Sequence, residues 1–189
     1  MQGSLVRNPL SVLFRWSRHR NSTDKHSGDT VLLASGDRNG GLHIWESFTG
    51  NLFYTLDGHR DDITRLSWRL DSNVIASASE DGSVRLWEMF NGKQVKSWTA
   101  HGGGTLSVQF NHSGDLVTAG RDRQVKIWDQ NGKQKRAING FKSLPLEAVF
   151  SNDGKRVFVG EWNGSVTAWD AANGKPLGEL SANPPTLAK

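Results

Sequence analysis

Four tryptophans recur along this chain at nearly constant intervals, and this repeat restricts the fold more than any other feature of the sequence. Intervals of 42, 41 and 41 residues separate Trp45, Trp87, Trp128 and Trp169. Each tryptophan ends a short segment in which apolar residues occupy every second position, a pattern typical of a half-buried β-strand. The sequence therefore predicts four copies of one structural unit, each with a Trp-bearing strand.

Turn-forming dipeptides divide each unit at three places. In the second unit they are Asp71-Ser72, Asp81-Gly82 and Asn91-Gly92. Asn-Gly and Asp-Gly supply the positive φ angles that two-residue hairpins require. Three hairpin turns join four antiparallel strands, and four strands in a repeat of this length form one blade of a β-propeller. We therefore expect an all-β fold of four blades, as a partial ring.

The expected strands follow from the same pattern. For the second blade they are residues 63–68, 74–79, 84–89 and 94–98; for the third, 105–110, 116–119, 125–129 and 133–138; for the fourth, 146–150, 157–160, 166–170 and 176–180. The first blade is less regular: beside residues 31–35 and the Trp45 strand, we expect residues 11–16 to be its innermost strand and residues 17–29 to be an insertion.

The chain thus divides into a basic N-terminal segment (1–30), the repeat region (31–180) and a short Pro-containing tail (181–189). The first segment has five basic and two acidic residues, and the remainder has eighteen basic and seventeen acidic residues. Since the repeat region is nearly neutral, the net charge of +4 does not indicate a nucleic-acid partner. No apolar run approaches the roughly 18–20 residues of a membrane span. No signal peptide is evident, which favours a cytoplasmic location and leaves the compartment open.

Cysteine is absent, which excludes disulfides, thiolate zinc sites, thiol nucleophiles and haem attachment through Cys-x-x-Cys-His. The six histidines lack the spacing of a helical metal site. The run Gly102-Gly103-Gly104 precedes a predicted strand rather than a helix, so we interpret it as a turn and not as a phosphate-binding loop. The sequence therefore predicts no metal and no cofactor.

The second unit resembles a WD repeat in Gly58-His59, in residues 77–82 (SASEDG) and in Leu86-Trp87-Glu88, and the pattern recurs over residues 31–180. The resemblance implies a β-propeller in which each blade holds a hydrogen-bonded tetrad of His, Ser or Thr, Asp and Trp. The matching residues are His59, Ser77, Asp81 and Trp87 in the second unit, and His101, Thr118, Asp122 and Trp128 in the third.

The outer units depart from that pattern. The first keeps Ser35 and Trp45 but has Asn39 in place of the Asp and no identifiable His. The fourth keeps Trp169 and has Phe141, Val159 and Asn163 at the other three positions. Residues 100–104, 116–122 and 180–185 also resemble the final blades of propellers in large multi-domain bacterial proteins.

A tetrad of this kind has the same residue types as a Ser-His-Asp catalytic triad. A triad needs an exposed nucleophile and an oxyanion hole, whereas Ser77 is expected in the middle of a packed strand. Buried indole and imidazole groups need hydrogen-bond partners, because an orphaned polar group costs about 1–3 kcal/mol. We therefore interpret the tetrads as structural and expect no enzymatic activity.

One position before the tetrad-turn Asp or Asn varies among the units. Its residues are Arg38, Glu80, Arg121 and Trp162. In a propeller these side chains would gather on one face around the central opening, where family members hold their partners. The sequence thus favours a non-enzymatic interaction scaffold for a protein or peptide.

Two further expectations concern the whole assembly. The alternative function is that of a truncated propeller segment from a larger exported protein, whose activity lies in absent domains. Because four blades would leave exposed sheet edges, which natural sheets avoid, a homodimer that completes a ring is a further expectation.

Overall fold

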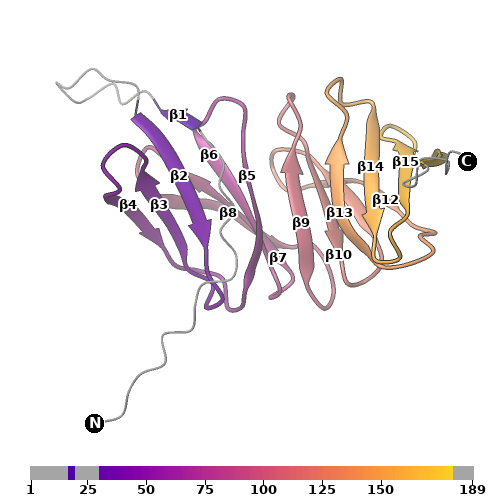
Figure 1. Cartoon of the computed structure of the whole chain (residues 1–189), viewed down its shortest axis with the longest axis horizontal. Coiled ribbons are helices and arrows are strands. Elements are labelled where there is room, and N and C mark those ends of the chain that lie inside the picture. Colours follow the sequence, from indigo (N-terminus) through magenta and orange to yellow (C-terminus); the bar gives the residue numbers. More distant parts are fainter. Residues whose placement is uncertain (1–16, 20–29, 181–189) are drawn as a thin grey trace, which may run out of the picture.

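The computed structural model describes residues 17–19 and 30–180, which form sixteen β-strands in four sheets (Figure 1). Each sheet contains four antiparallel strands in chain order, and successive sheets follow one another from the indigo to the yellow end of the molecule. Within these residues there is no helix that could span a membrane. The predicted all-β fold of four blades in a partial ring is confirmed.

The first two sheets span residues 17–99. The first contains β1 (Ser17–His19), β2 (Thr30–Gly36), β3 (Leu42–Glu46) and β4 (Leu52–Leu56). The second contains β5 (Ile63–Trp68), β6 (Val74–Ser79), β7 (Ser83–Glu88) and β8 (Lys93–Thr99).

The last two sheets span residues 105–180. The third contains β9 (Thr105–Phe110), β10 (Leu116–Gly120), β11 (Val125–Trp128) and β12 (Gln134–Ile138). The fourth contains β13 (Pro145–Phe150), β14 (Arg156–Glu161), β15 (Val166–Asp170) and β16 (Pro176–Leu180). The twelve strands of the second, third and fourth sheets lie within one residue of their expected bounds.

The innermost strand of the first sheet differs from the expectation. Strand β1 pairs with β2 through Ser17 opposite Leu32 and His19 opposite Thr30, so the start of the expected insertion at residues 17–29 is wrong. The expected strand at residues 11–16 lies outside the described residues. Residues 17–19 read Ser-Arg-His and lack the apolar alternation of the other strands, so the pattern could not reveal them.

Three hydrophobic clusters join neighbouring sheets. Each cluster combines one face of a sheet with the Trp-bearing face of the sheet that follows. In the second cluster, for example, Val84 and Leu86 of β7 pack with Phe110 and Trp128 of the third sheet. The core is therefore a series of sheet-to-sheet interfaces, as expected for a repeat protein whose units bury their faces only against their neighbours.

The pairing of the third and fourth strands shifts at the tryptophan in all four sheets. The register shift falls between Ile44 and Trp45, Leu86 and Trp87, Ile127 and Trp128, and Ala168 and Trp169. A bulge bends and twists the strand locally and re-aims a side chain. In the second, third and fourth sheets, the indole at this shift packs against the preceding sheet.

Polar side chains link the innermost strands of neighbouring blades. The amide of Phe110 donates to Ser67 Oγ at 3.0 Å, and the amide of Phe150 donates to Gln109 Oε1 at 2.7 Å. Arg65 of β5 forms an ion pair with Glu147 of β13, two blades away. These contacts hold the inner strands of the last three blades in a fixed arc.

Candidate functional site

The second blade brings together all four residues of its predicted tetrad. His59 precedes β5, Ser77 lies on β6, Asp81 in the β6–β7 turn and Trp87 on β7. His59 Nδ1 lies 3.0 Å from Asp81 Oδ2, and His59 Nε2 lies 2.7 Å from Ser77 Oγ. Trp87 Nε1 donates to the same Ser77 oxygen at 2.9 Å. The network joins two strands, the turn between them and the loop leading into the blade.

The direction of each hydrogen bond follows from the chemistry of the groups. An ionised carboxylate only accepts, so Nδ1 of His59 carries a proton that points to Asp81. Burial lowers the pKa of His59 and so disfavours a second proton on the imidazole. Nε2 is then an acceptor and receives the hydroxyl proton of Ser77. Ser77 is fully buried, and it accepts the indole proton of Trp87. Every polar hydrogen in the network therefore has an acceptor.

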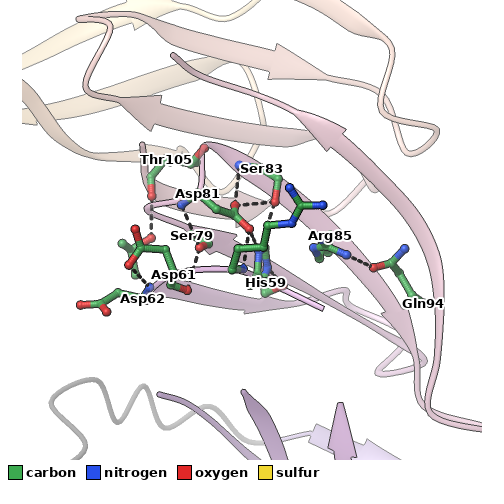
Figure 2. Close-up of polar contacts among 12 residues, drawn as sticks. His59, Asp61, Asp62, Ser79, Asp81, Ser83, Arg85, Gln94 and Thr105 are labelled. Atoms are coloured by element: carbon green, nitrogen blue, oxygen red, sulfur yellow. Dashed lines mark hydrogen bonds and ion pairs between the residues drawn. The ribbon is translucent and has the colours of Figure 1, made fainter. Parts of the chain in front are cut away.

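Asp81 fixes both the loop before the blade and the turn after β6. It accepts from the amides of Arg60 and Ser83 and from the Ser83 hydroxyl (Figure 2). Burial raises the pKa of Asp81, but the bonds from Ser83, Arg60 and His59 outweigh it and lower that pKa well below its ordinary value. Burial lowers the pKa of His59 despite the opposing effect of Asp81. The pair is thus held as carboxylate and neutral imidazole.

The third blade repeats the network. His101 lies 2.7 Å from both Asp122 and Thr118, and Trp128 Nε1 donates to Thr118 Oγ1 at 2.9 Å. Lys126 adds a contact that the second blade lacks: its Nζ donates to Asp122 and to the carbonyl of Ala100. The loop before this blade is therefore also fixed by the turn carboxylate, partly through a lysine.

In the first blade, two of the hydrogen-bonding residues are ones that the WD-repeat motif did not predict. Trp45 Nε1 donates to Ser35 Oγ at 2.8 Å, as the motif implies. Asp37 accepts from the amides of Asn39 and Gly41 and lies 3.1 Å from His43 Nε2. The carboxylate and the imidazole therefore come from positions outside the motif. The one sequence signal for His43 is that it lies two residues before Trp45 on β3, which places both side chains on the same face of the strand.

The fourth blade replaces the tetrad by apolar contacts and a different carboxylate. Phe141, at the His position, packs against Trp169 with ring centroids 5.0 Å apart. Trp169 Nε1 donates to Thr167 on its own strand at 2.8 Å, and Val159 is fully buried. Glu161 accepts from the Ser143 amide at 2.6 Å and so fixes the loop before the blade. Neither Thr167 nor Glu161 occupies a motif position.

The geometry also bears on the resemblance to a catalytic triad. Ser77 is fully buried, and its oxygen already accepts the Trp87 proton. A substrate carbonyl therefore has no path to this hydroxyl. A nucleophile in a triad must be exposed beside an oxyanion hole, so the arrangement suits a structural network.

Two of the four predicted rim side chains pair with each other. Arg121 donates two bonds to the carboxylate of Glu80, at 2.8 and 2.6 Å, from one blade to the next. The pair lies over Gly104, where an added Cβ would come within 2.3 Å of Glu80 Oε2. Gly104 also has a φ of 127°, a backbone conformation that glycine adopts readily and other residues rarely adopt, which accounts for glycine at the end of the Gly102–Gly104 run.

The other two rim residues are separate from this pair. Arg38 is exposed in the β2–β3 turn, and Trp162 is 74% exposed in the β14–β15 turn. Within the described residues neither side chain has a hydrogen-bonding or ring partner. All four residues lie in the turn between the second and third strands of their blades, so the rim combines one ion pair, one free cation and one free indole.

Comparison with known proteins agrees with this architecture. A family model described as "WD domain, G-beta repeat" matches residues 50–88 and 92–129. The chain contains WD repeats. The matched segments include the Trp-bearing strands of the second and third blades, which are the two blades with complete tetrads.

Several WD-repeat relatives are similar over most of the chain. Protein tipD of Dictyostelium discoideum is 29% identical over 177 residues, 92% of this chain and 29% of that protein. Pre-mRNA-splicing factor cwf17 of Schizosaccharomyces pombe is 30% identical over 146 residues, 75% of this chain and 42% of that protein. The crystal structure of the computationally designed Ika8 protein matches with a TM-score of 0.70 and 25% identity, covering 79% of this chain and 46% of that one. The WD-repeat chain spans less than half of each.

Proposed function

We propose that this chain is a non-enzymatic scaffold that binds a protein or peptide on the rim containing Arg38, Glu80, Arg121 and Trp162. WD-repeat proteins serve as interaction scaffolds in diverse complexes, and the relatives found here have names as different as tipD and a splicing factor. The partner's identity does not follow from the fold. The proposal also includes self-association, with a second copy of the chain as one of the partners.

The single observation that carries the proposal is the exposure of Trp162 on the rim. A large indole that is 74% exposed costs solvation free energy in the free protein, and buried tryptophans are frequent hot spots of interfaces. The ion pair of Glu80 and Arg121 stands on the same face, and such groups at the rim of an interface contribute to specificity and association rate. The surface therefore offers both an apolar anchor and oriented charge.

The test is affinity capture with matched variants. Immobilised wild-type chain, Trp162→Ala and Arg121→Ala are exposed to a lysate of the source organism, and Phe90→Ala is the control because Phe90 is 58% exposed in the β7–β8 turn, away from the rim. We expect at least one protein that wild type and control retain and that both rim variants lose. If every captured protein binds all four chains equally, the rim is not the binding surface.

A further inference from the structure

The fourth sheet exposes a face that the second sheet buries. Val74, Ala76, Val84 and Leu86 are all buried against the third sheet. The residues at the same distances from Trp169 are Arg156, Phe158, Val166 and Ala168. Of these only Ala168 is buried; Phe158 and Val166 are partly exposed and Arg156 is exposed. Three of the four are apolar. This face of the fourth sheet therefore has the composition of a buried face, although much of it is exposed.

Glycines in equivalent turns show the same difference. An added Cβ at Gly40 would meet the carbonyl oxygen of His59 at 2.4 Å, and at Gly82 it would meet that of His101 at 2.6 Å. In both cases the obstacle belongs to the next blade. The corresponding Gly164 has nothing within 4 Å. The fourth blade thus has the shape of a unit that receives a neighbour, and no sheet formed by residues 17–19 and 30–180 occupies that place.

The first sheet exposes the complementary face. Leu33 and Trp45 are partly exposed, whereas Ile75 and Trp87, at the same positions of the second sheet, are 0% and 2% exposed. This is the Trp-bearing face, which in the other three sheets packs on the preceding sheet. The two ends of the array therefore expose the two opposite halves of one repeated interface.

We propose that a second copy of this chain packs the Trp-bearing face of its first sheet (Leu33, Trp45) on the open face of the fourth sheet (Phe158, Val166), and that two such contacts close a ring of two copies. The proposal rests on the self-association that forms part of the proposed function and names its surface. A contact between unlike faces either closes into a ring or continues as a filament. Closure leaves no blade without a neighbour.

A second copy fits because it presents the half-interface that is missing. Any other occupant would have to present a Trp-bearing blade face, and the chain itself exposes one. The aligned part of the designed Ika8 structure is 46% of that chain, which leaves room for as many blades again. Because the two exposed faces match the two halves of the internal interfaces, a second copy is the partner that we infer.

This contact differs from the internal ones in its inner strand. Ser67 and Gln109 accept backbone hydrogen bonds from the following blade. The corresponding residue of β13 is Val149, which cannot accept one. The contact between copies therefore depends on apolar packing and lacks one hydrogen bond that each of two internal interfaces has, so it is weaker and separable.

The rim would be completed by the same contact. Glu80 reaches across an internal interface to Arg121, and Trp162 and Arg38 stand at the same positions on the two ends of the array. Closure brings Arg38 of the second copy next to Trp162, where a guanidinium over an indole forms a cation–π contact. The four rim residues would then form one internal pair and one pair between copies.

Sedimentation velocity tests the surface directly. We expect wild-type protein to sediment as one species of twice the 20.9 kDa chain mass. Phe158→Lys and Val166→Lys are expected to sediment as monomers with unchanged circular dichroism. The control is Phe90→Lys, which changes an exposed turn residue away from both faces and should leave the dimer intact.

A mixing experiment adds a positive result. Leu33→Glu on the first sheet should also give monomers, and a mixture with Phe158→Lys should recover dimers, because the mixed pair retains one wild-type contact. A compact wild-type monomer, or open-ended aggregation, would overturn self-association. Dimers that persist in both blade-four variants would overturn only the assigned surface. Neither result alters the capture test of the rim with Arg121→Ala.

Discussion

The second and fourth blades have the same four-stranded sheet, but they hold the tryptophan and the preceding loop in place with different side-chain contacts. In the second blade, Asp81, His59, Ser77 and Trp87 form a continuous chain of hydrogen bonds. In the fourth blade, Phe141 packs on Trp169 and Glu161 holds the preceding loop. Both arrangements seat the indole and fix the loop before the blade. The tetrad is therefore one way to build a blade and not a condition for the fold.

The largest expected effect is the loss of the residue that both blades share. Trp87→Ala should lower the free energy of unfolding by about 3–5 kcal/mol, because it removes a buried side chain from the interface between the first two sheets. Trp169→Ala should cost a similar amount, since Trp169 is 7% exposed in the third cluster. Denaturant titration measures both. A cost below about 1 kcal/mol for either would mean that the indole is not a core residue.

A single tetrad residue placed in the fourth blade tests whether apolar packing specifies that blade. Phe141→His should destabilise the protein by about 1–3 kcal/mol, because the buried Val159 offers no hydroxyl and the imidazole replaces the apolar ring that contacts Trp169. The control is Phe141→Leu, which keeps an apolar side chain there. If the histidine variant is as stable as the leucine variant, the apolar packing does not specify this blade.

Acid should destabilise the blades with tetrads. Burial lowers the pKa of His59 and His101, so below the ordinary value of 6.5 the unfolded chain binds protons that the folded chain excludes. Stability is complete above that pH and falls as the pH falls. Asp81 and Asp122, whose pKa values are also lowered, extend the loss below about pH 4.

Denaturant midpoints at about pH 8, 6.5 and 5 measure this dependence. His59→Ala should reduce the slope of stability against pH in this range, since one of the two buried imidazoles is removed. A midpoint that rises on acidification would contradict the assignment of neutral histidines.

The sequence predicted most of the fold and the two complete tetrads from different signals. Periodic tryptophans and Asn-Gly or Asp-Gly turns are local signals that predict the strands, whereas the tetrads were implied by the resemblance of the second and third units to a WD repeat. The sequence could not predict the contacts of Thr167, Glu161 and His43. Each of these residues makes a hydrogen bond like one in the tetrad but lies outside the motif positions, so only the side-chain geometry reveals it. The ion pair between Glu80 and Arg121 joins two blades, and sequence periodicity places both residues on the rim without showing that they touch.

The smallest expected effect concerns a turn of the third blade. Arg123 has a φ of 60° where the second and fourth blades have glycines, and a side chain in the left-handed region costs roughly 1–2 kcal/mol. Arg123→Gly should raise the free energy of unfolding by less than about 1 kcal/mol. The gain is small because glycine loses more backbone entropy on folding than arginine does. The matched change in the second blade is Gly82→Ala, which should destabilise it because of the His101 carbonyl.

The most direct test of the structural role of the tetrad is the denaturant midpoint of His59→Ala. His59 is 6% exposed and forms bonds to Asp81 and Ser77, so the variant should lose about 1–3 kcal/mol of stability. Its capture of the partners that wild type retains at the rim should be unchanged under conditions where it is folded. A wild-type midpoint combined with lost binding would contradict the account, because it would make His59 a functional rather than an architectural residue.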